Sequence, residues 1–247
     1  MYFNQKNTTL NFARSILCSF FFYIWAITIG LIMLPAAFIL PRKGFKFFVT
    51  TWAHGNSFIL LIISNIRVEI KGKEFIPQGA AIVASKHQSE WETNVFLYLL
   101  KDPVYVMKKE LLYIPGYGLF AQRMGMIFVD RQGHVRTLRS LIRKAKKAFK
   151  KGRPLVIFPE GTRLMPGEKG PYRTGVLGIY SECKVPIVPV VLNSGLCWPP
   201  RSFRKYPGTI TIEFLPHIPP GIQKDEALKR LQNCMENASD KLLQKPI

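Results

Sequence analysis

Apolar residues divide the chain into two parts with different patterns. Residues 15–41 carry no charged side chain and are dominated by large apolar residues, and residues 47–66 form a second stretch without Lys, Arg, Asp or Glu. A helix rises about 1.5 Å per residue, so the first stretch is long enough to cross a hydrocarbon core of roughly 30 Å. We therefore expect residues 1–66 to form a helical region that anchors the protein to a membrane.

The second uncharged stretch contains a polar cluster, residues 54–57, at its middle. Such a cluster is costly at a bilayer centre unless it packs against protein. Two arrangements remain open. The first stretch spans the membrane while the second lies in the interface or on the rest of the protein, or both form a hairpin in one leaflet, with Arg42, Lys43 and Lys46 reaching lipid phosphates.

From Arg67 onward, short apolar runs alternate with stretches of helical periodicity. The predicted strands are 68–71, 81–85, 104–108, 126–129, 155–158, 187–192 and 209–215. The predicted helices are 91–100, 111–124, 135–151, 174–183 and 224–243. This alternation favours an α/β fold with a mixed, largely parallel sheet flanked by helices. We expect residues 67–247 to form one domain.

The strand predicted at 187–192 has prolines around and within it, at positions 186 and 189. Proline has no N–H to donate to a neighbouring strand. We therefore expect this strand to lie at an edge of the sheet, or to be irregular beside a site.

The chain carries a net charge of +20, from 35 Lys and Arg against 15 Asp and Glu. Such an excess indicates an anionic partner, and the long uncharged stretches favour lipid. The predicted helix 135–151 has one apolar stripe and a basic remainder. That basic face is either simply solvated or a surface for anionic lipid, an acidic carrier protein or the phosphates of coenzyme A. RNA is disfavoured because no aromatic residues are interleaved with the charges.

The four cysteines show no C-x-x-C spacing and have no histidine nearby. We therefore expect neither a metal site nor a disulfide framework, which is consistent with a domain in a reducing compartment.

His87 stands where the predicted strand 81–85 gives way to the predicted helix 91–100. An imidazole there could accept a hydroxyl proton and return it to a leaving group. A carboxylate on the other ring nitrogen would fix the tautomer. Glu90 shares a face with His87 if His87 is already helical, whereas Glu92 comes within reach if His87 lies in the turn before the helix. Both remain candidates.

Residues 157–163, Ile-Phe-Pro-Glu-Gly-Thr-Arg, follow another apolar strand. Gly161 allows close approach to the backbone, Thr162 offers a hydroxyl, and Arg163 offers a planar fork suited to phosphate. Alone, the segment is equally consistent with a tight turn and a surface arginine. Asp130 and Arg131 similarly end the predicted strand 126–129.

Together, four segments resemble the motifs of the glycerolipid acyltransferase superfamily, most closely the 1-acyl-glycerol-3-phosphate acyltransferases. The first motif, H-x-x-x-x-D, is matched by residues 87–92 with Glu92 in place of Asp. The second, centred on an arginine after a strand, is matched by residues 128–131. The third, F-P-E-G-T-R, is matched in full by 158–163, and the fourth, V-P-x-x-P-V, by 185–190. The similarity covers residues 67–215, and the apolar N-terminal region also suits the family.

The resemblance implies a membrane-bound enzyme, with residues 67–247 as its catalytic domain, that places a fatty acyl chain on the sn-2 hydroxyl of 1-acyl-sn-glycerol 3-phosphate. His87 would be the general base, oriented by Glu92. The residues implied to form the substrate-binding site are Arg131, Glu160, Gly161, Thr162 and Arg163. Of these, Glu160 would position the loop. The longer arm of Glu92 requires the helix or the ring to shift if the hydrogen bond is to stay near about 2.6–3.2 Å.

The acyl donor implied by the resemblance is a thioester of coenzyme A or of acyl carrier protein, with no further cofactor and no metal. The implied location is the inner membrane, with the catalytic domain facing the cytosol. Other acceptors also fit the family: glycerol 3-phosphate, a lysophospholipid or a lyso-aminolipid. A basic membrane lipid-binding or RNA-binding protein without catalysis is a further alternative, but it leaves His87 and the complete third motif unexplained.

Overall fold

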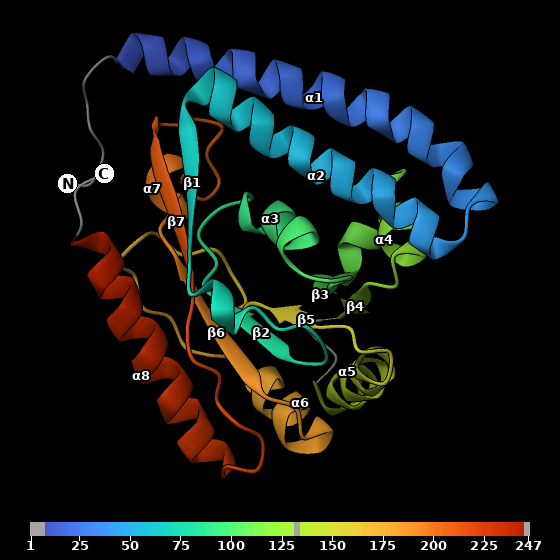
Figure 1. Ribbon diagram of the computed structural model, residues 1–247, viewed down its shortest axis with the longest axis vertical. Coiled ribbons are helices and arrows are strands. Elements are labelled where there is room, and N and C mark those ends of the chain that lie inside the picture. The colour runs from blue at the N-terminus through green and yellow to red at the C-terminus, as the bar shows by residue number, and fades with distance from the viewer. Residues whose placement is uncertain (1–7, 131–133, 245–247) are drawn as a thin grey trace.

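The computed structural model describes residues 8–130 and 134–244. Two helices come first, and an α/β domain follows (Figure 1). The helices are α1 (Thr8–Ile39), α2 (Arg42–Ser64), α3 (Glu92–Leu99), α4 (Tyr117–Arg123), α5 (His134–Phe149), α6 (Gly175–Cys183), α7 (Ser194–Cys197) and α8 (Lys224–Leu243), with 3-10 turns η1 (Lys73–Phe75) and η2 (Lys109–Tyr113). The strands are β1 (Ile66–Lys71), β2 (Ile82–Ser85), β3 (Val104–Lys108), β4 (Ile127–Val129), β5 (Leu155–Ile157), β6 (Ile187–Leu192) and β7 (Gly208–Phe214).

Within the described residues the strands form one seven-stranded sheet in the order β1-β7-β6-β2-β5-β3-β4. The β6–β7 pair is antiparallel, and the other neighbouring pairs are parallel. The predicted mixed, largely parallel sheet is therefore confirmed. The register runs Ile82 to Leu155 on one side of β2 and Ile82 to Ile187 on the other, so β2 lies in the middle of the sheet.

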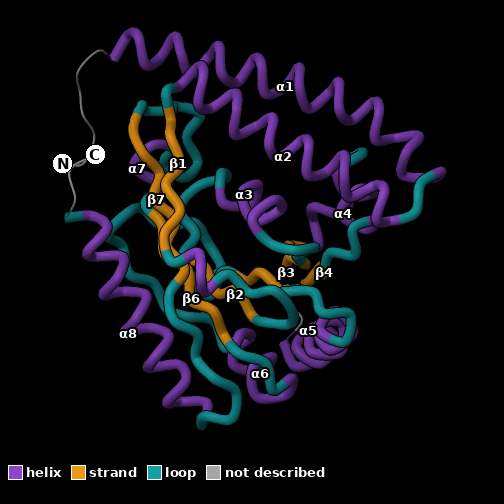
Figure 2. Tube along the Cα trace, in the orientation of Figure 1, coloured by secondary structure: helices purple, strands orange, loops and turns teal. Residues whose placement is uncertain are grey.

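Alternate side chains of the strands supply two separate cores. Val83 on β2 packs into the apolar cluster shared with α1, α2 and α3, whereas Ile82 and Ala84 pack into the cluster shared with α5, α6 and α8. Both faces of β2 are thus buried, which explains why its sequence reads as a continuous apolar run rather than an alternating one. Figure 2 shows the strands between these two helical layers.

The first two helices form a hairpin that lies across one side of the domain (Figure 1). Both are long and apolar enough, by length and composition, to cross a membrane. The outer surface of α1 carries large exposed apolar side chains, among them Phe20, Ile27, Leu31 and Phe38. Such a surface is typical of a site that contacts a membrane or another protein.

The polar cluster in α2 faces the domain. The His54 ring stacks on the Tyr98 ring with 4.4 Å between centroids, and Asn56 donates a hydrogen bond to Asn94 at 3.1 Å. The Ser57 and Tyr98 hydroxyls are 3.0 Å apart. The cluster therefore packs against α3, which is the condition that makes polar groups tolerable in an otherwise apolar helix.

Of the two arrangements predicted for the proline-containing strand, the edge position is wrong, and the irregular strand beside a site is the one that the structure shows. β6 lies inside the sheet, between β7 and β2. The carbonyl of Pro189 accepts a hydrogen bond from the Leu215 N–H just beyond the end of β7, and the next contact on that side is the isolated bridge between Ile187 and Ile218. The N–H that proline lacks would point towards β7 at a position where the regular β6–β7 pairing has already ended. Pro189 therefore removes no ladder hydrogen bond, and a strand inside the sheet can contain it.

The single helix predicted over 111–124 is also wrong, because it is divided into η2 and α4. Ile114 precedes a proline and is extended, with φ −73° and ψ 119°, as steric contact with the following ring favours. Gly116 has φ 72°, a conformation that favours glycine. The Ile114–Gly116 segment therefore ends one helical turn and starts the next.

The α1–α2 contact depends on Gly55, since a Cβ at this position would overlap the indole ring of Trp25. That ring is fixed by a 3.0 Å hydrogen bond from its Nε1 to the Trp52 carbonyl. We expect Gly55→Leu to lower the free energy of unfolding by about 1–3 kcal/mol through overpacking. The measurement is the thermal midpoint of the full chain in detergent. Gly30→Leu is the control, because a Cβ on Gly30 has no atom within 4 Å; equal midpoints for both variants would contradict the close contact.

Candidate active site

The candidate site lies at the edge of the sheet where the central parallel strands end. β2 runs parallel to both β5 and β6, so the residues that follow these three strands meet at one edge. Lys86 and His87 follow β2, the Phe158–Arg163 segment follows β5, and Ser194 follows β6. The first and third sequence motifs are therefore brought together by the register of the sheet.

The His87 ring is held by Glu92. The distance from His87 Nδ1 to Glu92 Oε1 is 2.8 Å, and the two side chains are 14% and 0% exposed. An ionised carboxylate can only accept, so in the neutral imidazole the proton is assigned to Nδ1 and the lone pair to Nε2. Within the part of the chain that the structure describes, Nε2 has no hydrogen-bond partner. A ring in this state can accept a proton at Nε2.

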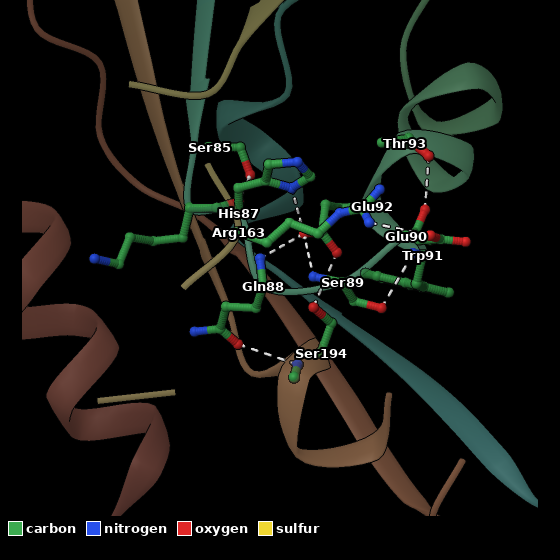
Figure 3. A network of polar contacts seen from close by, with 12 residues as sticks. Ser85, His87, Gln88, Ser89, Glu90, Trp91, Glu92, Thr93, Arg163 and Ser194 are labelled. Carbon is green, nitrogen blue, oxygen red and sulfur yellow. Dashed lines mark hydrogen bonds and ion pairs between the residues drawn. The ribbon is translucent and has the colours of Figure 1, made fainter. Parts of the chain in front are cut away.

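The buried Glu92 carboxylate has a full set of donors (Figure 3). In addition to the imidazole, Oε1 accepts from the backbone N–H groups of Gln88 at 2.6 Å and Ser89 at 2.7 Å. Oε2 accepts from the Ser194 hydroxyl at 2.9 Å. Four donors around one carboxylate offset the cost of burying its charge.

The choice between Glu90 and Glu92 follows from where the helix begins. α3 starts at Glu92, so His87 lies in the turn before it, and this turn wraps around the Glu92 carboxylate. Glu90 is exposed and forms an ion pair with Arg163, at 3.0 Å between Oε1 and Nη1. Of the two candidates, Glu92 contacts the ring.

The main chain of His87 is held by the segment that follows β5. Its N–H donates to Glu160 Oε2 at 3.1 Å, and its carbonyl accepts from the Leu164 N–H at 2.9 Å. The imidazole also stacks on the Phe158 ring, with 4.1 Å between centroids and 16° between planes. The third motif therefore fixes the backbone and one ring face of His87, while Glu92 fixes the ring edge.

Glu160 points inward, into a buried network of charges. Its Oε1 is 2.6 Å from Lys86 Nζ, and Lys86 also contacts Glu236 of α8 at 2.8 Å. Tyr172 donates to the same Glu236 carboxylate at 2.9 Å. Burial raises the pKa of the Glu160 carboxyl, and the Lys86 charge opposes that rise. The Glu160 side chain is 1% exposed, and its two oxygens tie the segment after β5 to Lys86 and to the His87 main chain.

The remaining predicted site residues differ in accessibility. Gly161 has φ 69°, which explains the glycine at this turn, and Thr162 is exposed beside it. The Arg163 side chain is 28% exposed, and its Nε is buried without a hydrogen-bond partner among the described residues. Arg131 lies outside the described residues, so its part in binding stays a prediction.

Two residues of the site were not predicted from the sequence. Lys86 directly precedes His87, and successive residues of an extended chain point to opposite faces, so a buried partner for Lys86 could have been expected on the far face of the sheet. Ser194 follows the fourth motif, and the only available signal was that a strand ends there. Its contact with Glu92 joins residues 102 positions apart, which no local pattern indicates.

Removal of the Lys86 ammonium should destabilise the fold, because the carboxylates that it pairs with would lose their cation. We expect Lys86→Met to lower the free energy of unfolding by about 3–5 kcal/mol at neutral pH, because Glu160 would remain buried without its cation. Since burial raises the Glu160 pKa, the group is protonated more readily in the folded protein, and the loss should shrink as the pH falls towards the ordinary range of a glutamate. Urea unfolding of the full chain in detergent at several pH values measures this.

The matched control for that variant is Lys169→Met. Lys169 also pairs with an α8 carboxylate, that of Asp240 at 2.8 Å, but the pair is exposed. This variant should unfold like the unmodified protein. Equal effects of the two substitutions would contradict the role of burial.

Comparison with known proteins identifies the family. A profile for the family described as Acyltransferase matches residues 67–193. The 1-acyl-sn-glycerol-3-phosphate acyltransferase of Pseudomonas aeruginosa is 33% identical over 191 residues, which cover 77% of this chain and 73% of the relative. The enzyme of the same name from Limnanthes alba is 30% identical over 200 residues, which cover 79% of this chain and 69% of the relative.

A solved structure shows the same fold. The crystal structure of the 1-acyl-sn-glycerophosphate acyltransferase PlsC from Thermotoga maritima matches with a TM-score of 0.78 at 23% identity, over 96% of this chain and 99% of that chain. The resemblance predicted from the four motifs is thus confirmed by both sequence and fold. The chain belongs to the acyltransferase family, and its relatives include enzymes named 1-acyl-sn-glycerol-3-phosphate acyltransferases.

Proposed function

We propose that this protein transfers a fatty acyl chain from a thioester to the sn-2 hydroxyl of 1-acyl-sn-glycerol 3-phosphate and so forms phosphatidate. The observation that carries the proposal is the 2.8 Å contact between His87 and the buried Glu92, which leaves the Nε2 lone pair available. The names of the relatives support this acceptor. The donor is acyl-CoA or an acylated carrier protein, and the reaction uses no additional cofactor.

The chemistry follows from the state of the ring. Nε2 accepts the proton of the acceptor hydroxyl while that oxygen attacks the thioester carbonyl. The imidazolium that forms is stabilised by the Glu92 carboxylate on Nδ1. When the tetrahedral intermediate collapses, the carbon–sulfur bond breaks and the leaving thiolate takes the proton from Nε2. The products are an ester and a free thiol, and His87 returns to its initial state.

We assign the acceptor phosphate to Arg163, with Gly161 and Thr162 beside it and Arg131 as a further predicted ligand. Arg163 is partly exposed, and its ion-pair partner among the described residues is the exposed Glu90, at 3.0 Å. A phosphate dianion can replace one carboxylate on a guanidinium because it offers more acceptor oxygens. Glu90 would then turn into solvent, where a carboxylate is well hydrated.

The acceptor is a membrane lipid, and the α1–α2 hairpin supplies a means of attachment. Its exposed apolar side chains, such as Phe38 on α1 and Phe58 on α2, would be buried in lipid. We propose that the protein resides on the inner membrane with the catalytic domain on the cytosolic side, where thioester donors are available.

Removal of the imidazole tests the general base. We expect His87→Ala to lower kcat by about 10²–10⁴-fold, because the hydroxyl proton would have no acceptor of matching basicity. The assay measures acylated product by mass spectrometry, with 1-acyl-sn-glycerol 3-phosphate, glycerol 3-phosphate and a lysophospholipid as acceptors. His217→Ala, on an exposed loop, is the control and should keep the original rate. Full activity of the His87 variant would refute the mechanism.

Removal of the guanidinium tests the phosphate assignment. Hydrogen bonds to charged groups contribute about 1.5–3 kcal/mol, so Arg163→Ala should raise KM for the phosphorylated acceptor by about ten- to hundredfold. KM for the thioester should stay unchanged. Arg230→Ala is a matched control, because Arg230 also pairs with a glutamate, Glu226 at 2.7 Å, but on α8. An unchanged acceptor KM in the Arg163 variant would remove this residue from the phosphate site.

A further inference from the structure

The segment after β6 contributes a buried hydroxyl to the site. Ser194 is the first residue of α7, is fully buried, and donates its hydroxyl hydrogen to Glu92 Oε2 at 2.9 Å. It directly follows the region matched by the family profile, which ends at residue 193. The fourth sequence motif, residues 185–190, takes no part in the proposed chemistry, but it forms most of the strand that leads to Ser194.

The two oxygens of the Glu92 carboxylate are held unequally. Oε1 accepts three hydrogen bonds, from His87 Nδ1 and from the Gln88 and Ser89 N–H groups. Among the described residues, Oε2 accepts one, from the Ser194 hydroxyl. The terminal torsion of a glutamate is broad and roughly two-fold, so contacts on one oxygen alone leave the carboxylate plane poorly defined. A second fixed point on Oε2 sets that plane and with it the direction of the bond to His87.

The position of Ser194 is fixed by its neighbours on both sides. The Asn193 side chain accepts from the Thr211 N–H of β7 at 2.8 Å, and the Gly195 N–H donates to the Gln88 side chain at 3.2 Å. A Cβ on Gly195 would lie 2.8 Å from Pro166 and 3.1 Å from the Gln88 Cβ, so the glycine permits this close approach. The hydroxyl is therefore presented by a rigid turn rather than by a mobile loop.

Figure 3 shows Ser194 and His87 on opposite sides of the Glu92 carboxylate. We propose that Ser194 is a positioning residue for acyl transfer: it orients the Glu92 carboxylate and, through it, the His87 ring, without contact with either substrate. This inference rests on the proposed function, because it concerns the rate of the same reaction. The turn after β6 thereby becomes a third support of the general base, beside the turn before α3 and the segment after β5.

Removal of the hydroxyl gives the first test. Ser194→Ala should lower kcat by about tenfold, with KM for acceptor and thioester unchanged, because the ring would be misdirected while both substrates bind as before. Ser194→Thr retains a hydroxyl and should recover most of the rate. Ser239→Ala, which removes another buried serine hydroxyl on α8, is the control and should leave kcat unchanged. Thermal midpoints and rates per folded enzyme separate misfolding from a catalytic effect.

A double-mutant cycle gives the second test. Glu92→Gln alone should lower kcat, and Ser194→Ala added to it should lower kcat no further, because the serine acts through the carboxylate. A wild-type kcat for Ser194→Ala, or an equal loss with and without Glu92→Gln, would overturn the proposal. Failure of the proposed function would look different, since the unmodified protein would then form no acylated product with any acceptor.

Discussion

The burial of the Glu92 carboxylate is the constraint on which the candidate site depends. A charge taken out of water must regain its hydrogen bonds from the protein, and here all the donors come from the turn His87–Ser89 and from Ser194. A turn that wraps around a carboxylate cannot be helical at the same time, so α3 begins at Glu92 and His87 stays in front of it. The longer side chain of glutamate suits this arrangement, because the carboxylate reaches back over the turn that precedes its own helix.

A second buried charge, the Lys86 ammonium, connects the opposite face of the sheet to His87. Lys86 and His87 are neighbours, yet Lys86 points to Glu236 on α8 and His87 points to Glu92 on α3. Glu160 joins the two, since one oxygen contacts the Lys86 ammonium and the other accepts from the His87 N–H. The C-terminal helix is thus not merely a cover for the sheet. Its Glu236 carboxylate completes the ionic network that holds the backbone of His87.

Local patterns predicted most of the elements. The helix expected over 111–124 failed on a local signal, the proline and glycine at 115 and 116, and the other failures arose where distant residues decide. Strand β2 and helix α8 could be predicted because apolar runs and helical periodicity lie in adjacent residues. The interior position of Pro189 could not, because it depends on where β7 ends, about 25 residues later. The family resemblance favoured Glu92, but spacing alone left both Glu90 and Glu92 open until the start of α3 was known. The contact of Ser194 could be recognised only once β6 was placed beside β2.

The α1–α2 hairpin and the candidate site both contact one structural element, α3. This helix begins with Glu92, and its next turns carry Asn94 and Tyr98, which hydrogen-bond to Asn56 and Ser57 of α2. The polar cluster that interrupts the second apolar stretch therefore anchors α2 to the helix that begins with Glu92. For a lipid acceptor this coupling matters, because its acyl chain stays in hydrocarbon while its glycerol must reach His87. With the hairpin attached to lipid as proposed, its direct link to α3 would hold the site at a fixed depth relative to the membrane.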